Sequence, residues 1–108
     1  MPDPVKIRAT LSGDTLDVRI MAPHVMESGQ RRDAQNRLIP AHHIERLVVS
    51  MNGKVMVDCE LGGAVAKNPL FGFKFRGAKA GDRITVSWVD TKGEKQVDEA
   101  VVSDGARN

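Results

Sequence analysis

The chain has 108 residues, of which 41% are hydrophobic and 28% charged, and its 16 basic residues nearly balance 14 acidic ones. This length suits a single domain, residues 1–108, with one hydrophobic core. A net charge of +2 is too small for a nucleic-acid-binding surface, and 4% aromatic residues without Tyr cannot form a base-stacking platform. No apolar run reaches transmembrane length and no secretory signal is visible, which by itself indicates a cytoplasmic protein.

Alternation of apolar and polar residues predicts seven short strands joined by tight turns. Asn52-Gly53 is the strongest hairpin signal, because both residue types tolerate positive φ. The polar tail, residues 103–108, is expected to fray. Seven strands at this spacing predict an all-β, immunoglobulin-like sandwich, with a small open barrel as the alternative. The strands cover about residues 5–11, 16–20, 44–51, 55–61, 71–76, 84–88 and 95–102.

The connection between the second and third strands, residues 21–44, is long, polar and charged, and it contains every histidine: His24, His42 and His43. A connection of this length is rarely kept in a compact domain unless it is used or disordered. Imidazole is a common metal ligand, but no spacing of His, Asp or Glu here completes a ligand set. Two adjacent histidines in a strand would point to opposite faces, so at most one can join His24. We therefore predict no metal and no other cofactor.

Cys59 is the single cysteine, which excludes a disulfide framework and a C-x-x-C redox pair. It shares the apolar side of its predicted strand with Val55, Val57 and Leu61. A cysteine in that setting is typically a small buried hydrophobic residue, and a reactive or interchain-bonded thiol is the alternative.

The loop after this strand contains Asn68 before Pro69, which favours extended geometry at Asn68 and a turn; it either connects the two sheets or contacts a partner. Phe71, Phe73 and Phe75 are interpreted as core. Apolar side chains on nominally outward positions indicate an adaptable contact surface. These are Met21, Met56, Val89 and Val102.

No catalytic arrangement is visible: the chain has no Gly-rich phosphate loop, no nucleophile elbow and no paired carboxylates. The pattern favours a binding protein over an enzyme.

Four segments are distinctive together: the opening KIRATLSGD, the loop HVMESGQRRDAQNRLIPAHHI, the turn AKNPLFGFKFRG and the ending GDRITVSWVDTKGEKQVDEA. In these segments the chain resembles the SoxZ family over nearly its whole length. Val25, His43 and Ala66 stand where that family usually has proline, an aromatic residue and serine. The matching positions are His24–Gly29, Pro40–Ile44, Ala66–Pro69, Trp88, Asp90, Gly93 and Asp98–Ala100.

The resemblance implies a non-catalytic subunit of the periplasmic SoxYZ carrier complex of thiosulfate and sulfur oxidation. Its partner SoxY would carry the sulfur intermediates on a cysteine in a C-terminal Gly-Gly-Cys-Gly-Gly arm, which this chain lacks. Export together with SoxY would account for a periplasmic location without a visible signal. Other sulfur-oxidation enzymes would be transient partners, and no nucleic acid or membrane is implied.

The resemblance to the SoxZ family, together with the strand pattern, indicates the candidate site residues. Cys59 is the candidate interchain thiol. The candidate partner contacts are His24, Met26, Glu27, Met56, Asn68, Pro69 and Val89.

A second resemblance supplies the alternative function. H-x-M at His24–Met26 and H-x-I at His42–Ile44 are similar to superoxide reductase, whose sandwich binds iron through four histidines and one cysteine. That site also needs a C-N-x-H-G motif near the end, and this chain ends in DEAVVSDGARN. The alternative is therefore a metal-binding sandwich with an incomplete site.

Overall fold

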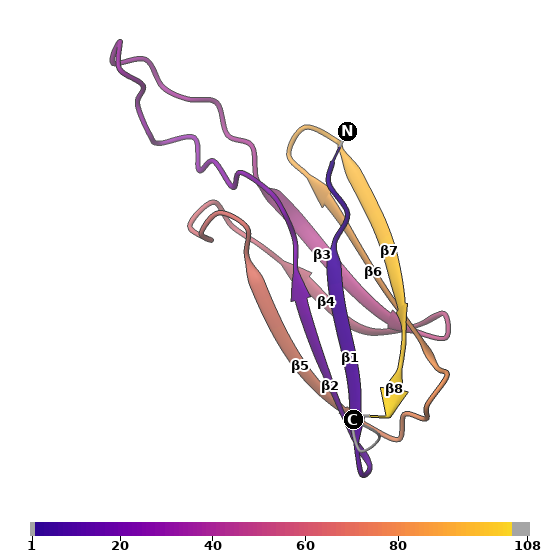
Figure 1. Cartoon of the computed structure of the whole chain (residues 1–108). Helices are drawn as coiled ribbons and strands as arrows, with labels where there is room; N and C mark the ends of the chain where they lie inside the picture. The colour runs from indigo at the N-terminus through magenta and orange to yellow at the C-terminus, as the bar shows by residue number, and fades with distance from the viewer. Residues whose placement is uncertain (1, 105–108) are drawn as a thin grey trace.

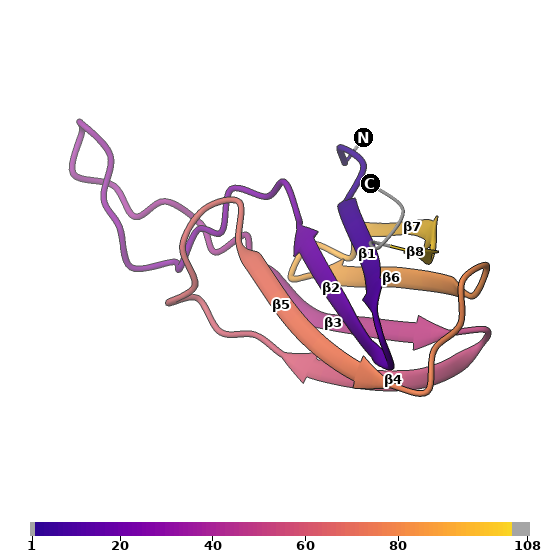
Figure 2. The same ribbon diagram turned by 60° about the horizontal axis from the view of Figure 1, so that its bottom comes forward.

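Two four-stranded sheets pack face to face in the computed structural model, which describes residues 2–104 (Figures 1 and 2). One sheet has the order β5-β2-β1-β8 and the other the order β4-β3-β6-β7. The described residues contain no helix long and apolar enough to cross a membrane. The strands are β1 (Lys6–Ser12), β2 (Thr15–Met21), β3 (Ile44–Met51), β4 (Lys54–Glu60), β5 (Leu70–Arg76), β6 (Arg83–Asp90), β7 (Lys95–Val101) and β8 (Ser103–Asp104).

Tight turns join the hairpins as the sequence predicts. Asn52 and Gly53 both have positive φ, 50° and 84°, the conformation that a two-residue hairpin turn requires. All pairings within the two sheets are antiparallel except that between β1 and β8. The seven predicted strands and the sandwich are thus confirmed.

The core lies between the sheets and consists of the inward residues of each alternating strand. The residues of this core that are at most 3% exposed include Leu16, Val18, Ile20, Ile44, Leu47, Val49, Ile84, Val86 and Trp88. Phe71, Phe73 and Phe75 are partly buried and pack against this core, as expected.

A register shift in β4 corrects one sequence prediction. Val57 pairs with Val49, but Val55 pairs with Ser50, so Met56 is an extra residue opposite the shift. An extra residue in one strand of a pair reverses the inward and outward alternation beyond it. Val55 is therefore 56% exposed. Simple alternation predicted that Val55 shares the inner side with Val57, and this prediction is wrong.

The end of the chain also differs from expectation. Ser103 and Asp104 form β8 rather than fraying, while residues 105–108 of the predicted frayed tail lie outside the described part. Because β7 and β8 belong to different sheets, the chain crosses the sandwich at Val102. Val102 is consequently 2% exposed and belongs to the core, which corrects its predicted place on an outer surface.

Candidate functional site: a histidine–aspartate clamp at the root of a projecting arm

Residues 22–43, here called the arm, leave the sandwich after β2 and return to it at β3 (Figure 1). The arm projects beyond the end of the sheets, and the molecule measures 54 × 25 × 21 Å. Its two limbs are joined by backbone hydrogen bonds between Glu27 and His42, of 2.7 and 2.9 Å. The predicted unusual loop is therefore an ordered two-limbed structure.

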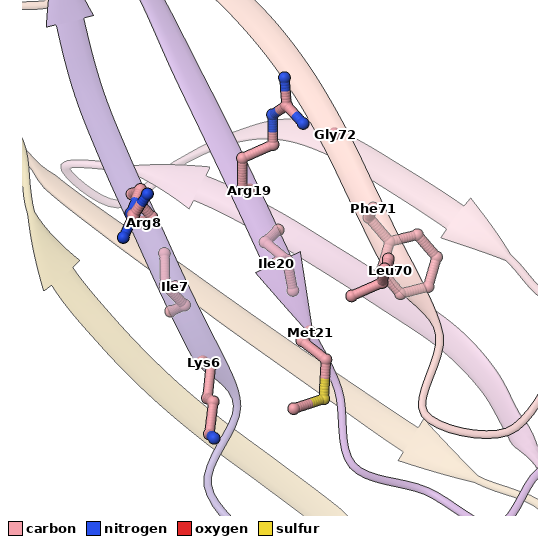
Figure 3. Close-up of a pocket in the computed structure, with 9 residues that line it drawn as sticks. All are labelled: Lys6, Ile7, Arg8, Arg19, Ile20, Met21, Leu70, Phe71 and Gly72. Carbon is pink, nitrogen blue, oxygen red and sulfur yellow. The ribbon is translucent and has the colours of Figure 1, made fainter.

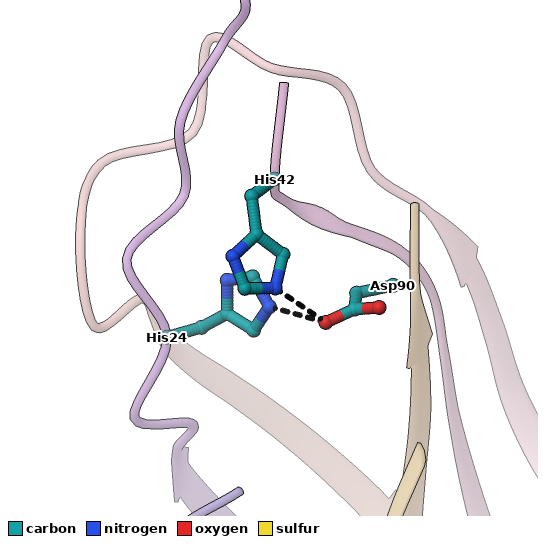
Figure 4. Close-up of side chains that lie close together, drawn as sticks. All are labelled: His24, His42 and Asp90. Carbon is teal, nitrogen blue, oxygen red and sulfur yellow. Dashed lines mark hydrogen bonds and ion pairs between the residues drawn. The ribbon is translucent and has the colours of Figure 1, made fainter. Parts of the chain in front are cut away.

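A single carboxylate holds both ends of the arm (Figure 4). The Oδ2 atom of Asp90, at the end of β6, lies 2.9 Å from Nε2 of His24 and 2.9 Å from Nε2 of His42. The His42 Nε2 atom also lies 3.0 Å from Oε1 of Glu94. We call His24, His42 and Asp90 the clamp. Its side chains are largely removed from water: those of Asp90 and His24 are 0% and 4% exposed, and that of His42 is 23% exposed.

The hydrogen bonds assign the protonated nitrogen of His24. The backbone N–H of Met26 donates to Nδ1 of His24 at 3.1 Å, so Nδ1 must be an acceptor without a proton. The ring proton of neutral His24 is then on Nε2, from where it is donated to Asp90. The ring also packs edge-on against Trp88, with ring centroids 5.1 Å apart.

Asp90 is the central acceptor of this network. Its Oδ1 atom accepts the backbone N–H groups of Lys92 and Glu94 at 3.0 and 2.9 Å, which caps the β6–β7 turn. Burial acts to raise the pKa of the Asp90 carboxyl, but the hydrogen bonds, led by that from His24, hold its pKa below the usual value. The clamp is thus built around a buried, ionised carboxylate.

Three potential metal ligands do meet here, which corrects the sequence-based argument that no ligand set forms. The ligand atoms of His24, His42 and Asp90 lie within 4.8 Å of one another. A histidine bound to a metal through Nε2 carries its proton on Nδ1 and donates it to a neighbour. At His24 that proton would face the Met26 N–H, because Nδ1 already accepts from it. The arrangement therefore does not fit a metal ion without a change at Met26, and it fits a hydrogen-bonded clamp.

Of the two adjacent histidines, only His42 joins His24, as the sequence predicts. His43 lies on the other side of the limb, where its Nδ1 atom is 3.1 Å from the carbonyl of Ile44. Its backbone carbonyl accepts the N–H of Thr91 at 2.9 Å. The return limb is therefore fixed to the β6–β7 turn twice, through His42 and through His43.

Asn68 and Pro69 lie against the outgoing limb. The backbone N–H of His24 donates to Oδ1 of Asn68 at 3.0 Å, and the Asn68 N–H donates to the carbonyl of His24 at 2.9 Å. Pro69 accepts the N–H of Ala22 at 3.1 Å. Asn68 has a φ of 51°, which corrects the predicted extended geometry: asparagine tolerates the left-handed region, and here its side chain is bonded to the arm.

The predicted partner contacts within the arm have different positions. Glu27 is partly exposed and pairs with Arg31. Met26 is 6% exposed, and its sulfur accepts the N–H of Ile44 at 3.4 Å. The buried side chains of Met26 and His24 hold the arm against the sandwich through their hydrogen bonds. Direct contact of either residue with a partner stays a prediction.

The outer face of the β4-β3-β6-β7 sheet carries a small apolar surface. Val48 and Val97 both lie opposite Ser87, and Val89 lies two residues further along β6 on the same face, so the three define what we call the valine patch. They line one shallow depression together with Arg46 and Lys95. Val97 is 63% exposed and was not singled out by the sequence. Met56 and Val89, the predicted contacts on this sheet, are both partly buried.

The outer face of the other sheet is different in character (Figure 3). Outward positions of β1, β2 and β5 carry five cations and one carboxylate, Asp17, which pairs with Arg19 at 3.0 Å. Met21 lies at one end of this face opposite Leu70, which is 79% exposed. The two outer faces therefore offer different surfaces, one with an apolar centre and one basic. The five cations are Lys6, Arg8, Arg19, Lys74 and Arg76.

Cys59 lies opposite Leu47 in the β3–β4 pair and shares its side of the sheet. Leu47 is fully buried, so Cys59 faces the core, as the sequence predicts. Because β4 is at the edge of its sheet, Cys59 is only partly buried. The geometry agrees with a packed thiol and leaves an interchain bond as a prediction.

The fold defines a class: a β-sandwich protein whose architecture is shared with superoxide reductases. A superoxide reductase (neelaredoxin) from Ignicoccus hospitalis has a TM-score of 0.64 at 14% identity, covering 95% of this chain and 81% of its own. A hypothetical protein from Pyrococcus horikoshii has 0.63 at 16%, covering 94% and 89%. The reduced neelaredoxin from Archaeoglobus fulgidus has 0.59 at 18%, covering 94% and 88%. At these identities the likeness shows the fold alone.

The chain belongs to the SoxZ family. The family model described as "Sulphur oxidation protein SoxZ" matches residues 5–101, nearly the whole chain. No curated protein matches the sequence. The chain is therefore a component of a Sox sulfur-oxidation system, and its likeness to superoxide reductases is a likeness of architecture.

Proposed function

We propose that this protein is the non-catalytic subunit of a periplasmic SoxYZ carrier complex in thiosulfate and sulfur oxidation. It supports a SoxY-like partner, whose C-terminal cysteine holds the sulfur intermediates. Membership of the SoxZ family over residues 5–101 carries this proposal. The site agrees with it, because the hydrogen bonds of His24 and His42 to Asp90 hold the two limbs of the arm to the sandwich.

The valine patch is the surface best suited to this partner. Stable interfaces have an apolar centre and a polar rim. Val48, Val89 and Val97 form such a centre, and the pair Arg46–Asp58 lies beside it with its charges mutually compensated. On the basic outer face of the other sheet, the apolar side chains Met21 and Leu70 lie at one end and not at the centre. The heterodimer therefore forms, on this proposal, across the β4-β3-β6-β7 sheet.

Coexpression tests the pairing. A SoxY-like chain from the same host, carrying the affinity tag, should retain the untagged protein through washing at high salt, because an apolar interface is little weakened by screening. Removing the export signal of the SoxY-like chain should leave both proteins in the cytoplasm. Loss of retention in every buffer would reject the proposed function.

The alternative of a superoxide-reductase-like metal protein is favoured by the shared fold and by the meeting of His24 and His42. The Met26–His24 hydrogen bond speaks against it, as described above. We therefore retain the carrier-subunit function.

A further inference from the structure

The outer part of the arm has no core of its own. From Ser28 to Ala41 no side chain is buried, and every residue from Arg31 to Leu38 is exposed. A two-stranded structure without a hydrophobic face is at best marginally stable in water. An arm of this kind is suited to contact with another surface.

The tip of the arm is nevertheless built in a defined shape. Oδ1 of Asp33 accepts the N–H groups of Gln35 and Arg37 at 2.9 and 3.0 Å. Asn36 has a φ of 62°, and its N–H donates to the carbonyl of Asp33 at 2.9 Å. Together with the clamp at the root, these bonds fix the arm before binding. Such preorganisation lowers the entropic cost of association.

The chemistry of the tip defines what it can bind. Leu38 is 54% exposed and lies opposite Arg32 in the two limbs. Among side chains that the structure describes, Arg32 and Arg37 have no carboxylate partner, and Arg32 instead donates to the carbonyl of Asn36 at 2.9 Å. An apolar knob beside two unpaired guanidinium groups is complementary to an apolar pocket rimmed by carboxylates. Arginine is one of the residues enriched among those that dominate interface energies.

The root of the arm is continuous with the valine patch. His43 of the arm lines one groove together with Arg46 and Val89 of the outer sheet face. A protein covering the valine patch therefore reaches the root of the arm without a gap, and the tip projects from that root. This continuity favours one occupant for both surfaces.

We propose that the tip of the arm, formed by Arg32, Arg37 and Leu38, docks into a carboxylate-rimmed apolar pocket on the same partner subunit that covers the valine patch. This inference rests on the proposed function and adds a second, electrostatic contact to it. The valine patch supplies apolar area, and the tip selects a partner of complementary charge.

The experiment measures the dissociation constant of the coexpressed heterodimer at several NaCl concentrations. The double variant Arg32→Gln/Arg37→Gln should raise the dissociation constant at low salt by at least about tenfold and flatten its dependence on salt. Leu38→Ala should also raise it about tenfold, but with an unchanged salt dependence. The control Lys74→Gln/Arg76→Gln removes the same charge from the other sheet and should leave both quantities as in the wild type.

The outcomes separate the two proposals. If the wild-type chain does not bind the SoxY-like protein, the proposed function fails. If the wild type binds but the tip variants bind equally well and with the same salt dependence, the arm inference alone fails. If the tip variants instead abolish self-association of this chain and leave the heterodimer unchanged, a second copy is the occupant and the inference is wrong. Matching circular dichroism melts of all variants exclude misfolding as the cause.

Discussion

The Nε2 atom of His24 lies 2.9 Å from the Oδ2 atom of Asp90, although 66 positions separate them in the chain. This contact joins the outgoing limb of the arm to the β6–β7 turn, and His42 joins the returning limb to the same oxygen. The direction of the arm is thus set by one buried carboxylate. Sequence periodicity does not report such a contact, because it depends on how a turn and a loop meet in space.

Replacing Asp90 should destabilise the fold strongly. Asp90→Asn places an NH₂ group opposite the buried N–H of His24 or, with the amide turned over, opposite the N–H groups of Lys92 and Glu94, so in either orientation a donor loses its acceptor. The free energy of unfolding should fall by about 2–3 kcal/mol. Urea denaturation measures it, with Asp17→Asn as the control, since that partly exposed carboxylate pairs with exposed Arg19 on the outer face of a sheet. Equal effects of the two replacements would contradict the central role of the clamp.

The clamp should also give stability a specific dependence on pH. The pKa of Asp90 in the folded protein lies below its ordinary value of 3.8, so near that value the unfolded chain binds more protons than the folded protein. The stabilisation is therefore fully present above about pH 4 and is lost as the pH falls through the folded pKa. In denaturation series from pH 6 to pH 2, Asp90→Asn should show a shallower loss of stability than the wild type. A steeper loss in Asp90→Asn than in the wild type would contradict a lowered pKa of Asp90 in the folded protein.

The protein should hold no stoichiometric iron, zinc or copper. His24 cannot present Nε2 to a metal while its Nδ1 accepts the Met26 N–H. Elemental analysis of protein purified without a histidine tag measures this. About one metal ion per chain that disappears in both His24→Ala and His42→Ala would instead support the superoxide-reductase-like alternative.

Cys59 should carry no sulfur intermediate. Cys59 faces the core opposite buried Leu47. It lies within strand β4 and not on a mobile segment that could deliver it to an enzyme. After thiosulfate turnover by the complex, peptide mass spectrometry should locate every adduct on the partner. A thiosulfonate on Cys59 would overturn this expectation. A disulfide from Cys59 to the partner would leave it intact and would show that the partly buried thiol is reachable.

The sequence predicted the strands well because alternation reports which side of a sheet a residue faces. It failed at Val55 and Val102, where a register shift and a crossing between sheets change that side without any local signal. For the site, it identified His24 and the opposed directions of His42 and His43. It singled out Asp90 only as a position matching the family and assigned it no role, although an Asp at the start of a turn such as Asp90-Thr91-Lys92-Gly93 is a signal for a side chain that accepts backbone N–H groups.

The valine patch makes the interface proposal testable by single replacements. Val89→Asp and Val97→Asp should each weaken the heterodimer at least tenfold, because a charge placed at the centre of an apolar interface is desolvated without a partner. Met56→Asp, beside the register shift, should act in the same direction. Leu70→Asp is the matched control, since Leu70 is 79% exposed on the opposite sheet. A heterodimer broken by Leu70→Asp and unaffected by Val97→Asp would assign the interface to the basic face.

The most direct test of the account is the molar mass of the protein with and without its partner, measured by light scattering during size-exclusion chromatography. We predict a stable one-to-one heterodimer with a coexpressed SoxY-like chain, and self-association when the 11.8 kDa chain is expressed alone with its valine patch uncovered. A well-behaved monomer in both samples, with the SoxY-like chain eluting separately, would contradict it.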